Sequence, residues 1–196
     1  MRQANIHRKT KETEVELDLV LDPADEQDIT IYTGVGFFDH MLTLMAHWAG
    51  LGLRVQCRGD LHVDAHHSLE DVGICLGQAL EKALGDKKGI NRVGRASVPL
   101  DEALCECVLD ISGRPYLVYA GDQLLPVQVA GEERDIWREF FKSLAYNAGM
   151  NLHLVFHYGQ NGHHLMESAF KSLGLALRQA VELGRADLLS TKGALD

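Results

Sequence analysis

The chain of 196 residues is 46% hydrophobic and 24% charged, as expected of a globular protein with a sizeable core. Its formal net charge of −9 argues against a nucleic-acid-binding surface, and it means that an anionic substrate needs a local basic pocket. No stretch reaches the length of a membrane span, the N-terminal region has no apolar signal segment, and the four cysteines form no CxxC pair, so we expect a cytoplasmic protein without membrane or nucleic-acid partners.

The first part of the chain reads as strands and helices in alternation. Residues 10–21 alternate polar and apolar side chains from Glu14 onward, which predicts a half-buried strand. A polar turn follows, and we expect the β-rich segment 29–33 to return as the hairpin partner of that strand. Glycines end each of the helical patterns that come next. The further elements expected here are a helix over 38–49, a strand over 51–57 and a helix over 66–84.

From about residue 93 the pattern starts again. Short alternating segments bounded by turns with Gly and Pro predict three strands, and a helix that ends at Gly149 then leads to a strand and a second long helix. A polar tail over 185–196 follows. The strands are expected over 95–99, 103–111, 116–120 and 152–157, and the helices over 136–148 and 163–183.

An internal repeat organises this arrangement. The segment His66-His67-Ser68-Leu69-Glu70 recurs as His163-His164-Leu165-Met166-Glu167, and matching small and apolar positions follow each copy. A single HHxxE motif is a weak signal, whereas two copies that each open an amphipathic helix are a strong one. Aligning Ala49-Gly50 with Ala148-Gly149 also sets His40 opposite Glu139.

The repeat predicts a single domain over 1–196 with an α+β fold, built from two pseudo-repeat halves of about 1–92 and 93–196. In each half we expect a four-stranded sheet with two helices packed on one face, because a sheet buries its apolar side under helices. We expect the two halves to pack about a pseudo-twofold axis.

The chemistry of the repeated segment follows from helical geometry. The first His and the Glu of each copy are four residues apart, so they share one helix face and can bind the same divalent ion. The second His points about 100° away, which suits a second ion or a bridged site. Together the copies supply four imidazoles and two carboxylates, a set that favours Mn, Fe or Zn over Mg or Ca.

Cationic and hydroxyl side chains outside the repeated segments indicate a pocket for a small anion. Two arginines lie in turns that contain glycine, and the tail combines hydroxyls, a cation and a glycine in a way that suits a phosphate. Lys171 lies four residues after Glu167, on the expected metal face, and its first-half counterpart is the apolar Ile74. The residues of this group are Arg92, Arg114, Lys171, Ser190, Thr191 and Lys192.

Eight short strings occur in order along the chain: Lys11-Glu12-Thr13, Phe38-Asp39-His40-Met41-Leu42, His66-His67-x-x-Glu70-Asp71, Pro99-Leu100-Asp101-Glu102-Ala103, Ser112-Gly113-Arg114-Pro115, His163-His164-x-x-Glu167, Phe170-Lys171 and Thr191-Lys192-Gly193. In this combination, which covers nearly the whole chain, the sequence resembles the imidazoleglycerol-phosphate dehydratase family. The fold of that family, a pair of βαβ-type halves, agrees with the repeat.

The resemblance implies an enzyme, a hydro-lyase of histidine biosynthesis. Its substrate would be D-erythro-imidazole-glycerol 3-phosphate and its product imidazole acetol phosphate. The resemblance also implies two Mn²⁺ ions per site and a homo-oligomer of twenty-four subunits with sites between subunits. An imidazole ring held between two metal ions becomes imidazolate because the ions lower its pKa, and the electron-rich ring then expels the neighbouring hydroxyl.

Carried over position by position, the resemblance implies three sets of residues. Glu139 stands where the family often has His, and Trp48 where many members have a substrate-contacting His. Acid–base work falls to Glu12 or Glu167, with no choice between them. The implied metal ligands are His40, His66, His67, Glu70, Glu139, His163, His164 and Glu167. The implied substrate-binding residues are Glu12, Arg92, Arg114, Lys171, Ser190, Thr191 and Lys192, with the cationic ones on the phosphate.

Two other functions fit part of the sequence. A dinuclear metal phosphohydrolase would use the same metal ligands but would release inorganic phosphate, whereas a dehydratase keeps the phosphate ester. A metal-storage shell would take up metal without needing Arg92, Arg114 and Lys171. Detection of the ketone product and of free phosphate separates these alternatives.

Overall fold

Alternating side chains build the first sheet, in which the apolar residues of each strand face the interior. In its second strand Val15, Leu17 and Leu19 are buried, while the acidic residues between them face outward. The structure, a computed structural model, describes residues 2–24, 27–184, 186–193 and 195. The strands of this sheet are β1 (Gln3–Lys9), β2 (Thr13–Val20), β4 (Gly52–Gly59) and β3 (Ile29–Tyr32), in that spatial order.

The prediction that segment 29–33 pairs with the preceding strand as a hairpin is wrong. Strand β3 instead pairs with β4, in parallel, and β4 separates it from β2. Helix α1 (Gly36–Ala49) lies between β3 and β4 in the chain and provides the long connection that a parallel pair requires. The hairpin partner of β2 is β1, which the sequence analysis did not predict.

The second sheet has the same topology as the first. Its order is β5-β6-β10-β7, with β7 parallel to β10 as β3 is to β4. Between β7 and β10 the chain also forms a short 3-10 helix (Asp122–Leu124), the small hairpin of β8 (Gln128–Val129) and β9 (Glu132–Glu133), and helix α3 (Arg134–Asn147). The strands of this sheet are β5 (Val93–Leu100), β6 (Ala103–Asp110), β7 (Tyr116–Ala120) and β10 (Asn151–Tyr158).

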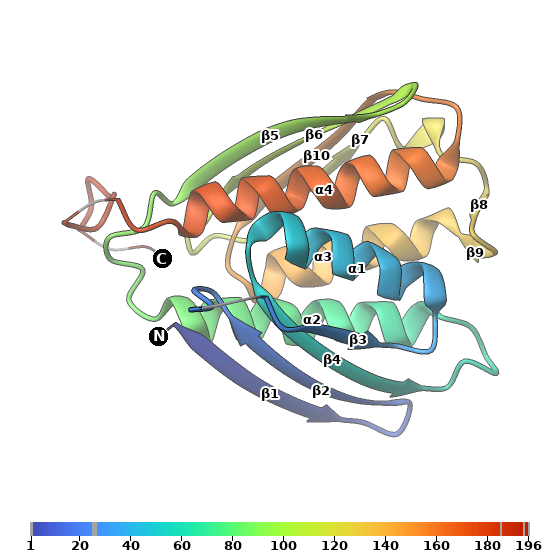
Figure 1. Ribbon diagram of the computed structural model, residues 1–196, viewed down its shortest axis with the longest axis horizontal. Helices are drawn as coiled ribbons and strands as arrows, with labels where there is room; N and C mark the ends of the chain where they lie inside the picture. The colour runs from blue at the N-terminus through green and yellow to red at the C-terminus, as the bar shows by residue number, and fades with distance from the viewer. Residues whose placement is uncertain (1, 25–26, 185, 194, 196) are drawn as a thin grey trace.

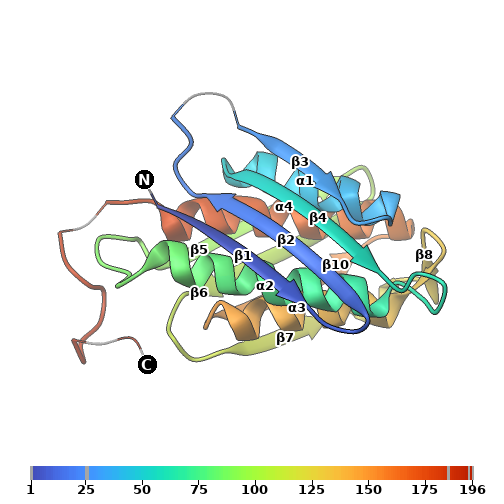
Figure 2. The same cartoon turned by 90° about the horizontal axis from the view of Figure 1, so that it is seen from below.

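Four helices fill the space between the two sheets, so the molecule has three layers (Figure 1). Figure 2 shows the first sheet lying across the helical layer. The predicted α+β fold of two related halves, each with a four-stranded sheet and two helices on one face, is therefore confirmed. The helices are α1 (Gly36–Ala49), α2 (His66–Leu84), α3 (Arg134–Asn147) and α4 (Gly162–Val181).

The helices pack across the two halves, α1 on α4 and α2 on α3. The glycines that the repeat matches, Gly77 and Gly174, are contact points of these pairs. A Cβ at Gly174 would lie 2.6 Å from the carbonyl oxygen of Met45, and one at Gly77 would lie 2.7 Å from that of Leu144. Because glycine permits this close approach, the start of α1 comes to lie beside the start of α4.

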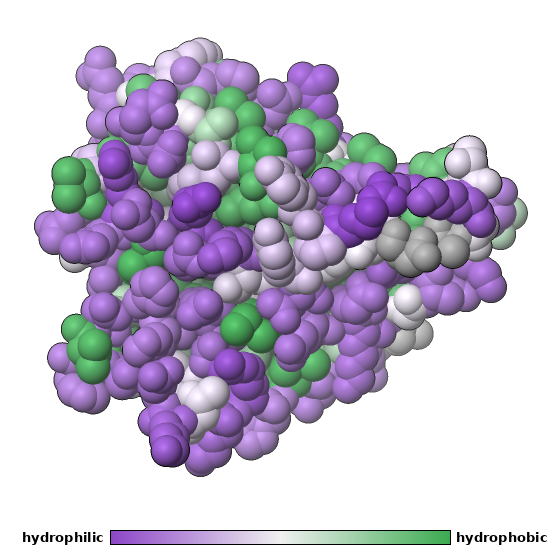
Figure 3. Space-filling model, turned by 180° about the vertical axis from the view of Figure 1, so that it is seen from behind, coloured by the Kyte–Doolittle hydropathy of each residue, from purple (hydrophilic) through white to green (hydrophobic). Residues whose placement is uncertain are grey.

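All four helices begin at the same end of the sandwich, the right-hand end in Figure 1. The described tail residues 186–193 lie at the opposite end. The molecular surface seen from behind is mostly hydrophilic, with apolar residues in smaller groups (Figure 3). Among the described residues, no helix combines the length and the apolar character that crossing a membrane requires.

Candidate metal centre and anion pocket

Three metal-capable side chains meet where α1 packs against α4. The Nε2 atoms of His40 and His163 lie 3.4 and 3.3 Å from the same carboxylate oxygen of Glu167. All three donor atoms lie within 4.8 Å of one another. Two imidazole nitrogens and a carboxylate oxygen at this spacing fit neighbouring ligands of a Mn²⁺, Fe²⁺ or Zn²⁺ ion, whose bonds are about 2.0–2.2 Å long. This group needs both halves, because His40 comes from the first and the other two residues from the second.

The carboxylate of Glu167 is held as an anion. Burial raises its pKa, but Lys171, His40 and His163 outweigh that effect, so the net pKa lies below the ordinary value. Lys171 forms an ion pair with the second carboxylate oxygen of Glu167, and its ammonium lies over the Trp48 ring, 5.4 Å from the ring centroid. Trp48 and Glu167 thus fix Lys171 at the edge of this group.

The repeat counterparts of these three residues also come from both halves, along α2 and α3, but they are arranged differently. Glu139 forms an ion pair with Lys142, whose Nζ lies 2.8 Å from the carboxylate. The hydrogen bond and charge of Glu139, and the more distant charge of Glu70, raise the pKa of Lys142. Among the described residues, groups of three donors at metal-binding spacing are formed by His40, His163 and Glu167 and by one further set, His7, Glu14 and Glu16. The predicted ligands His66, Glu70 and Glu139 therefore do not form such a group within one chain.

The set of His7, Glu14 and Glu16 lies on the outer face of β1 and β2. His7 is 3.2 Å from Glu14, and Lys9 is 3.1 Å from the other oxygen of the same carboxylate. None of the three residues of this set belongs to either copy of the repeated segment, and all three lie on the outer face of their strands. We therefore assign this set to an ordinary surface ion-pair network.

The second histidine of each repeated segment is paired with a carboxylate through Nδ1. The Nδ1 atom of His67 is 3.1 Å from Asp60, and that of His164 is 2.7 Å from Glu102. These hydrogen bonds raise the pKa of both imidazoles. The same bond, with backbone N–H groups, lowers the pKa of Glu102 to about 2. Asp60 and Glu102 were missed as functional residues by the sequence analysis, although Glu102 lies in one of the strings that carry the family resemblance.

Glu12 lies in the turn between β1 and β2, with its carboxylate 4.0 Å from Nε2 of His67. Its side chain is 57% exposed. Two residues that flank the turn fix it to α2, because Arg8 and Thr13 both donate hydrogen bonds to the buried carboxylate of Asp71. Asp71 follows directly after Glu70, so the hairpin that carries Glu12 is attached to the same helix that carries the first histidine pair.

Most of the predicted anion-binding residues lie together, near the end of α4. They surround a cavity of about 130 Å³. Arg92 binds Asp110 through two hydrogen bonds of 2.6 and 2.9 Å and donates a third, of 2.5 Å, to the carbonyl of Leu189, so it attaches the tail to the body of the protein. The residues around the cavity are Arg92, Ser112, Arg114, Ser190, Thr191, Lys192 and Leu195.

Metal group and anion pocket are far apart within one chain. The backbone N–H of Arg92 donates to the carbonyl of Ala180, near the end of α4, whereas Glu167 lies in its first turns. Thirteen residues of helix separate these positions, or roughly 20 Å at 1.5 Å per residue. Lys171, which the sequence analysis grouped with the phosphate residues, lies at the metal end.

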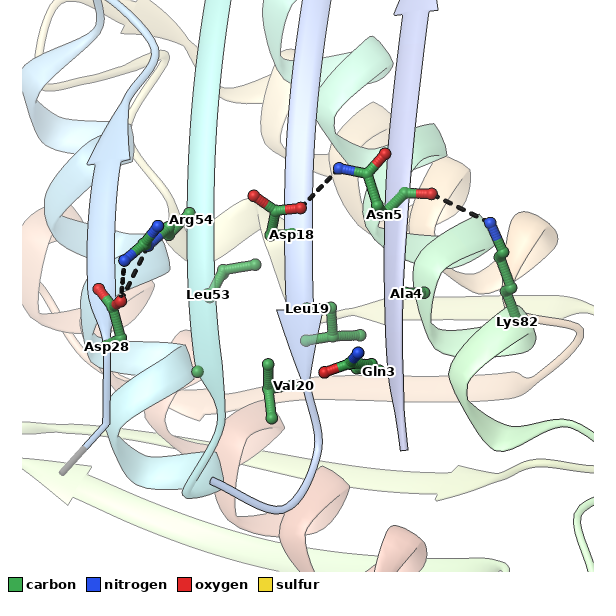
Figure 4. A pocket seen from close by; sticks show the side chains of 11 residues that line it. Gln3, Ala4, Asn5, Asp18, Leu19, Val20, Asp28, Leu53, Arg54 and Lys82 are labelled. Atoms are coloured by element: carbon green, nitrogen blue, oxygen red, sulfur yellow. Dashed lines mark hydrogen bonds and ion pairs between the residues drawn. The ribbon is translucent and has the colours of Figure 1, made fainter. Parts of the chain in front are cut away.

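A larger hollow, of about 440 Å³, lies on the outer face of the first sheet (Figure 4). Most of the polar side chains around it already have partners within the protein. Asn5 donates to Asp18 at 2.6 Å, Lys82 donates to the carbonyl of Asn5 at 3.2 Å, and Arg54 pairs with Asp28. Because these groups satisfy one another and include no predicted site residue, the hollow is a feature of the sheet surface.

Comparison with known proteins decides the family. The model of the family described as imidazoleglycerol-phosphate dehydratase matches residues 33–177. The chain belongs to the imidazoleglycerol-phosphate dehydratase family. It is therefore an enzyme of the hydro-lyase class that acts in histidine biosynthesis, as the sequence predicted.

Full-length relatives support the same assignment. The imidazoleglycerol-phosphate dehydratase of Maridesulfovibrio salexigens is 60% identical over 195 residues, which cover 100% of this chain and 98% of that protein. That of Streptococcus sanguinis is 52% identical, with complete coverage of both chains. The crystal structure of the Staphylococcus aureus enzyme superposes with a TM-score of 0.82 at 35% identity, covering 93% of this chain and 99% of the other. A Pyrococcus furiosus structure of the family gives 0.81 at 34% identity, covering 97% and 100%.

Proposed function

We propose that the protein dehydrates D-erythro-imidazole-glycerol 3-phosphate to imidazole acetol phosphate at a site that holds two Mn²⁺ ions. The observation that carries the metal requirement is the group of His40, His163 and Glu167, in which two imidazoles and one carboxylate converge. The anion pocket with Arg92 and Arg114 suits the phosphate. The names of the relatives point to the same substrate.

The proposed metal ligands provide the donors for two ions when both copies of the repeated segment meet. Bound Mn²⁺ would polarise the imidazole ring of the substrate and lower its pKa. The ligands proposed to hold the ions are His40, His66, His67, Glu70, Glu139, His163, His164 and Glu167.

Proton transfer is assigned to Glu12 rather than to Glu167. Lys171, His40 and His163 all interact with the Glu167 carboxylate and hold it as an anion, so it is a poor proton acceptor. Glu12 is more exposed and lies beside His67, close to the proposed metal position. In the reaction the carbon–oxygen bond of the leaving hydroxyl breaks, and Glu12 takes the proton from the neighbouring carbon. The hydroxyl leaves as water after gaining a proton, and the enol that remains becomes the ketone.

The direct assay follows the ultraviolet absorbance of imidazole acetol phosphate, with inorganic phosphate measured in the same sample. Ketone formation without phosphate release supports the dehydratase. Release of phosphate would support a dinuclear phosphohydrolase instead, and metal uptake without either product would support a storage function.

Chelation and acid are both expected to remove activity. After treatment with a chelator and gel filtration we expect activity to be lost and to return with Mn²⁺. Imidazole ligands must be neutral to bind a metal, and the pKa values of His67 and His164 are raised. Mn²⁺ affinity should therefore fall as the pH drops through these raised values, starting above the ordinary imidazole pKa of about 6.5. Mn²⁺ titrations at a series of pH values measure this, and an affinity independent of pH would contradict it.

Replacing Arg114 with alanine is expected to raise KM and to leave the Mn²⁺ content unchanged. A charge-assisted hydrogen bond to a phosphate contributes about 1.5–3 kcal/mol, which corresponds to a KM increase of roughly tenfold to a hundredfold. Arg95→Ala is the matched control, because Arg95 pairs with Glu106 on the outer face of the same sheet. Loss of metal from the Arg114 variant would show that Arg114 acts at the metal centre and not on the phosphate.

We also propose that each site is shared between subunits of a homo-oligomer, in keeping with the twenty-four-subunit assembly expected from the family. Two observations support this. Within one chain the predicted ligands His66, Glu70 and Glu139 form no three-donor group among the described residues. The anion pocket lies roughly 20 Å from Glu167 along α4, which is too far for one small substrate to bridge.

A further inference from the structure

The two halves place a glutamate at the same point of their first hairpins. Glu12 directly precedes β2, and Glu102 directly precedes β6, its counterpart in the second sheet. Each carboxylate approaches the second histidine of the repeated segment in its own half. The nitrogen that it approaches differs, because Glu12 lies 4.0 Å from Nε2 of His67 whereas Glu102 lies 2.7 Å from Nδ1 of His164.

A second pair of equivalent positions accounts for this difference. Asp60 directly follows β4, and Gly159 directly follows β10, the matching strand of the other sheet. The carboxylate of Asp60 lies 3.1 Å from Nδ1 of His67 and accepts its hydrogen. Gly159 offers no side chain, and a Cβ there would lie 2.6 Å from Leu165, so that half has no room for an equivalent carboxylate. In the second half it is therefore Glu102 that binds Nδ1 of the histidine, His164.

We infer that Asp60 and Glu102 are positioning residues that orient His67 and His164 for metal binding, and that the presence of Asp60 frees Glu12 for proton transfer. A neutral imidazole has one N–H and one nitrogen lone pair. When a carboxylate accepts the Nδ1 hydrogen, the ring is held in one orientation and its Nε2 lone pair is directed to the metal with increased basicity. The inference rests on the proposed function, since it concerns the same metal ions and the same proton transfer.

The surroundings of the two hairpin glutamates agree with this division. One oxygen of Glu102 accepts the backbone N–H groups of Gln160 and Asn161, at 3.2 and 2.8 Å, while the other binds His164. Both oxygens of Glu102 are thus engaged, and its carboxylate strongly favours the anion. Glu12 faces the Nε2 side of His67, the side on which a metal and its substrate would lie.

The test uses the assembled, full-length protein, from which metal is first removed. For each variant, calorimetric titration gives the Mn²⁺ affinity, and a separate assay at saturating Mn²⁺ gives kcat. Loss of a carboxylate that orients a metal-binding histidine typically weakens metal affinity by about tenfold to a hundredfold. We expect that loss in Asp60→Ala and in Glu102→Ala, and partial recovery in Asp60→Asn and Glu102→Gln, whose amide oxygens still accept the Nδ1 hydrogen. Glu12→Ala should bind Mn²⁺ as the wild type does, with kcat lowered by roughly 10²–10⁴-fold.

The control is Asp64→Ala, because Asp64 lies in the same loop but accepts a backbone N–H, that of His66, rather than an imidazole N–H. Its Mn²⁺ affinity should match the wild type. Wild-type Mn²⁺ affinity in folded Asp60→Ala and Glu102→Ala proteins would overturn the orienting role. A weakened affinity in Glu12→Ala equal to that in Glu102→Ala would overturn the division between the two glutamates. If the wild-type protein binds Mn²⁺ but forms no ketone, the proposed function is overturned. The orienting role is then still decided by the Mn²⁺ affinities of the variants.

Discussion

Alanine in place of Glu167 is expected to remove metal from the group at the start of α4 and to lower kcat/KM by about a thousandfold or more. The Nε2 atoms of His40 and His163 lie 3.4 and 3.3 Å from one carboxylate oxygen of Glu167. Without it two imidazoles are left as ligands, and Lys171, whose side chain is only 13% exposed, loses its anionic partner at the same place. An unpaired ammonium repels a divalent cation. Metal-assisted stabilisation of a transition state supplies several kcal/mol, and each 1.36 kcal/mol is a factor of ten in rate.

The repelling ammonium and the missing ligand can be separated by a second variant. Glu167→Ala combined with Lys171→Met removes the cation as well as the carboxylate, and metal is still not expected to bind because two imidazoles alone are a weak site. Metal content by mass spectrometry of the purified proteins is the measurement, together with kcat/KM. His7→Ala is the control, since His7 belongs to the other three-donor group, on the outer face of the first sheet. If the His7 variant lost the catalytic metal and the Glu167 variant kept it, the metal centre would have to be placed on that face.

The helices could be predicted from the sequence because their signals are local. The predicted helix over 66–84 has the bounds of α2, and the other three differ by a few residues at their ends. The strand partners were harder, because pairing depends on residues far apart in the chain. Segment 29–33 is rich in β-formers, but nothing local shows that its partner lies on the far side of a helix. Strand β1 escaped prediction because its exposed positions are polar and only Ala4 is fully buried.

The candidate site shows the same division between local and distant information. Helical spacing places His163 and Glu167 on one face, as the sequence predicts, and the structure puts them 3.3 Å apart. The approach of His40 depends on which helices pack together, and that is decided by contacts such as Gly174 against α1. The roles of Asp60 and Glu102 depend on loops that follow different strands, so the repeated motif alone gives no sign of them.

Mixing two inactive variants is expected to restore activity if sites lie between subunits. One variant carries His66→Ala and Glu70→Ala in the first copy of the repeated segment. The other carries His163→Ala and Glu167→Ala in the second copy. Each variant alone lacks one set of ligands in every site, so each should be inactive. In an oligomer with equal amounts of both variants, each site takes its two copies of the segment from two different chains. Each of these copies is intact with a probability of about one half. Roughly a quarter of the sites should then be complete, with activity near a quarter of the wild type, as closed symmetry repeats the same contact throughout the oligomer.

The structural reason for expecting shared sites is that His66, Glu70 and Glu139 form no three-donor group within one chain among the described residues. The anion pocket also lies near the end of α4, far from the helix starts. A substrate of a few ångströms cannot touch the Glu167 and the Arg114 of the same chain when roughly 20 Å of helix separates their elements. A neighbouring subunit can supply the missing part. Co-expression with two affinity tags, followed by purification on both, ensures that the assayed particles contain both variants. Wild type mixed with either variant is the control and should retain about half of the sites. Mixed particles without activity would show that one chain supplies both copies of the repeated segment to a site, which would overturn the expected sharing of the metal ligands.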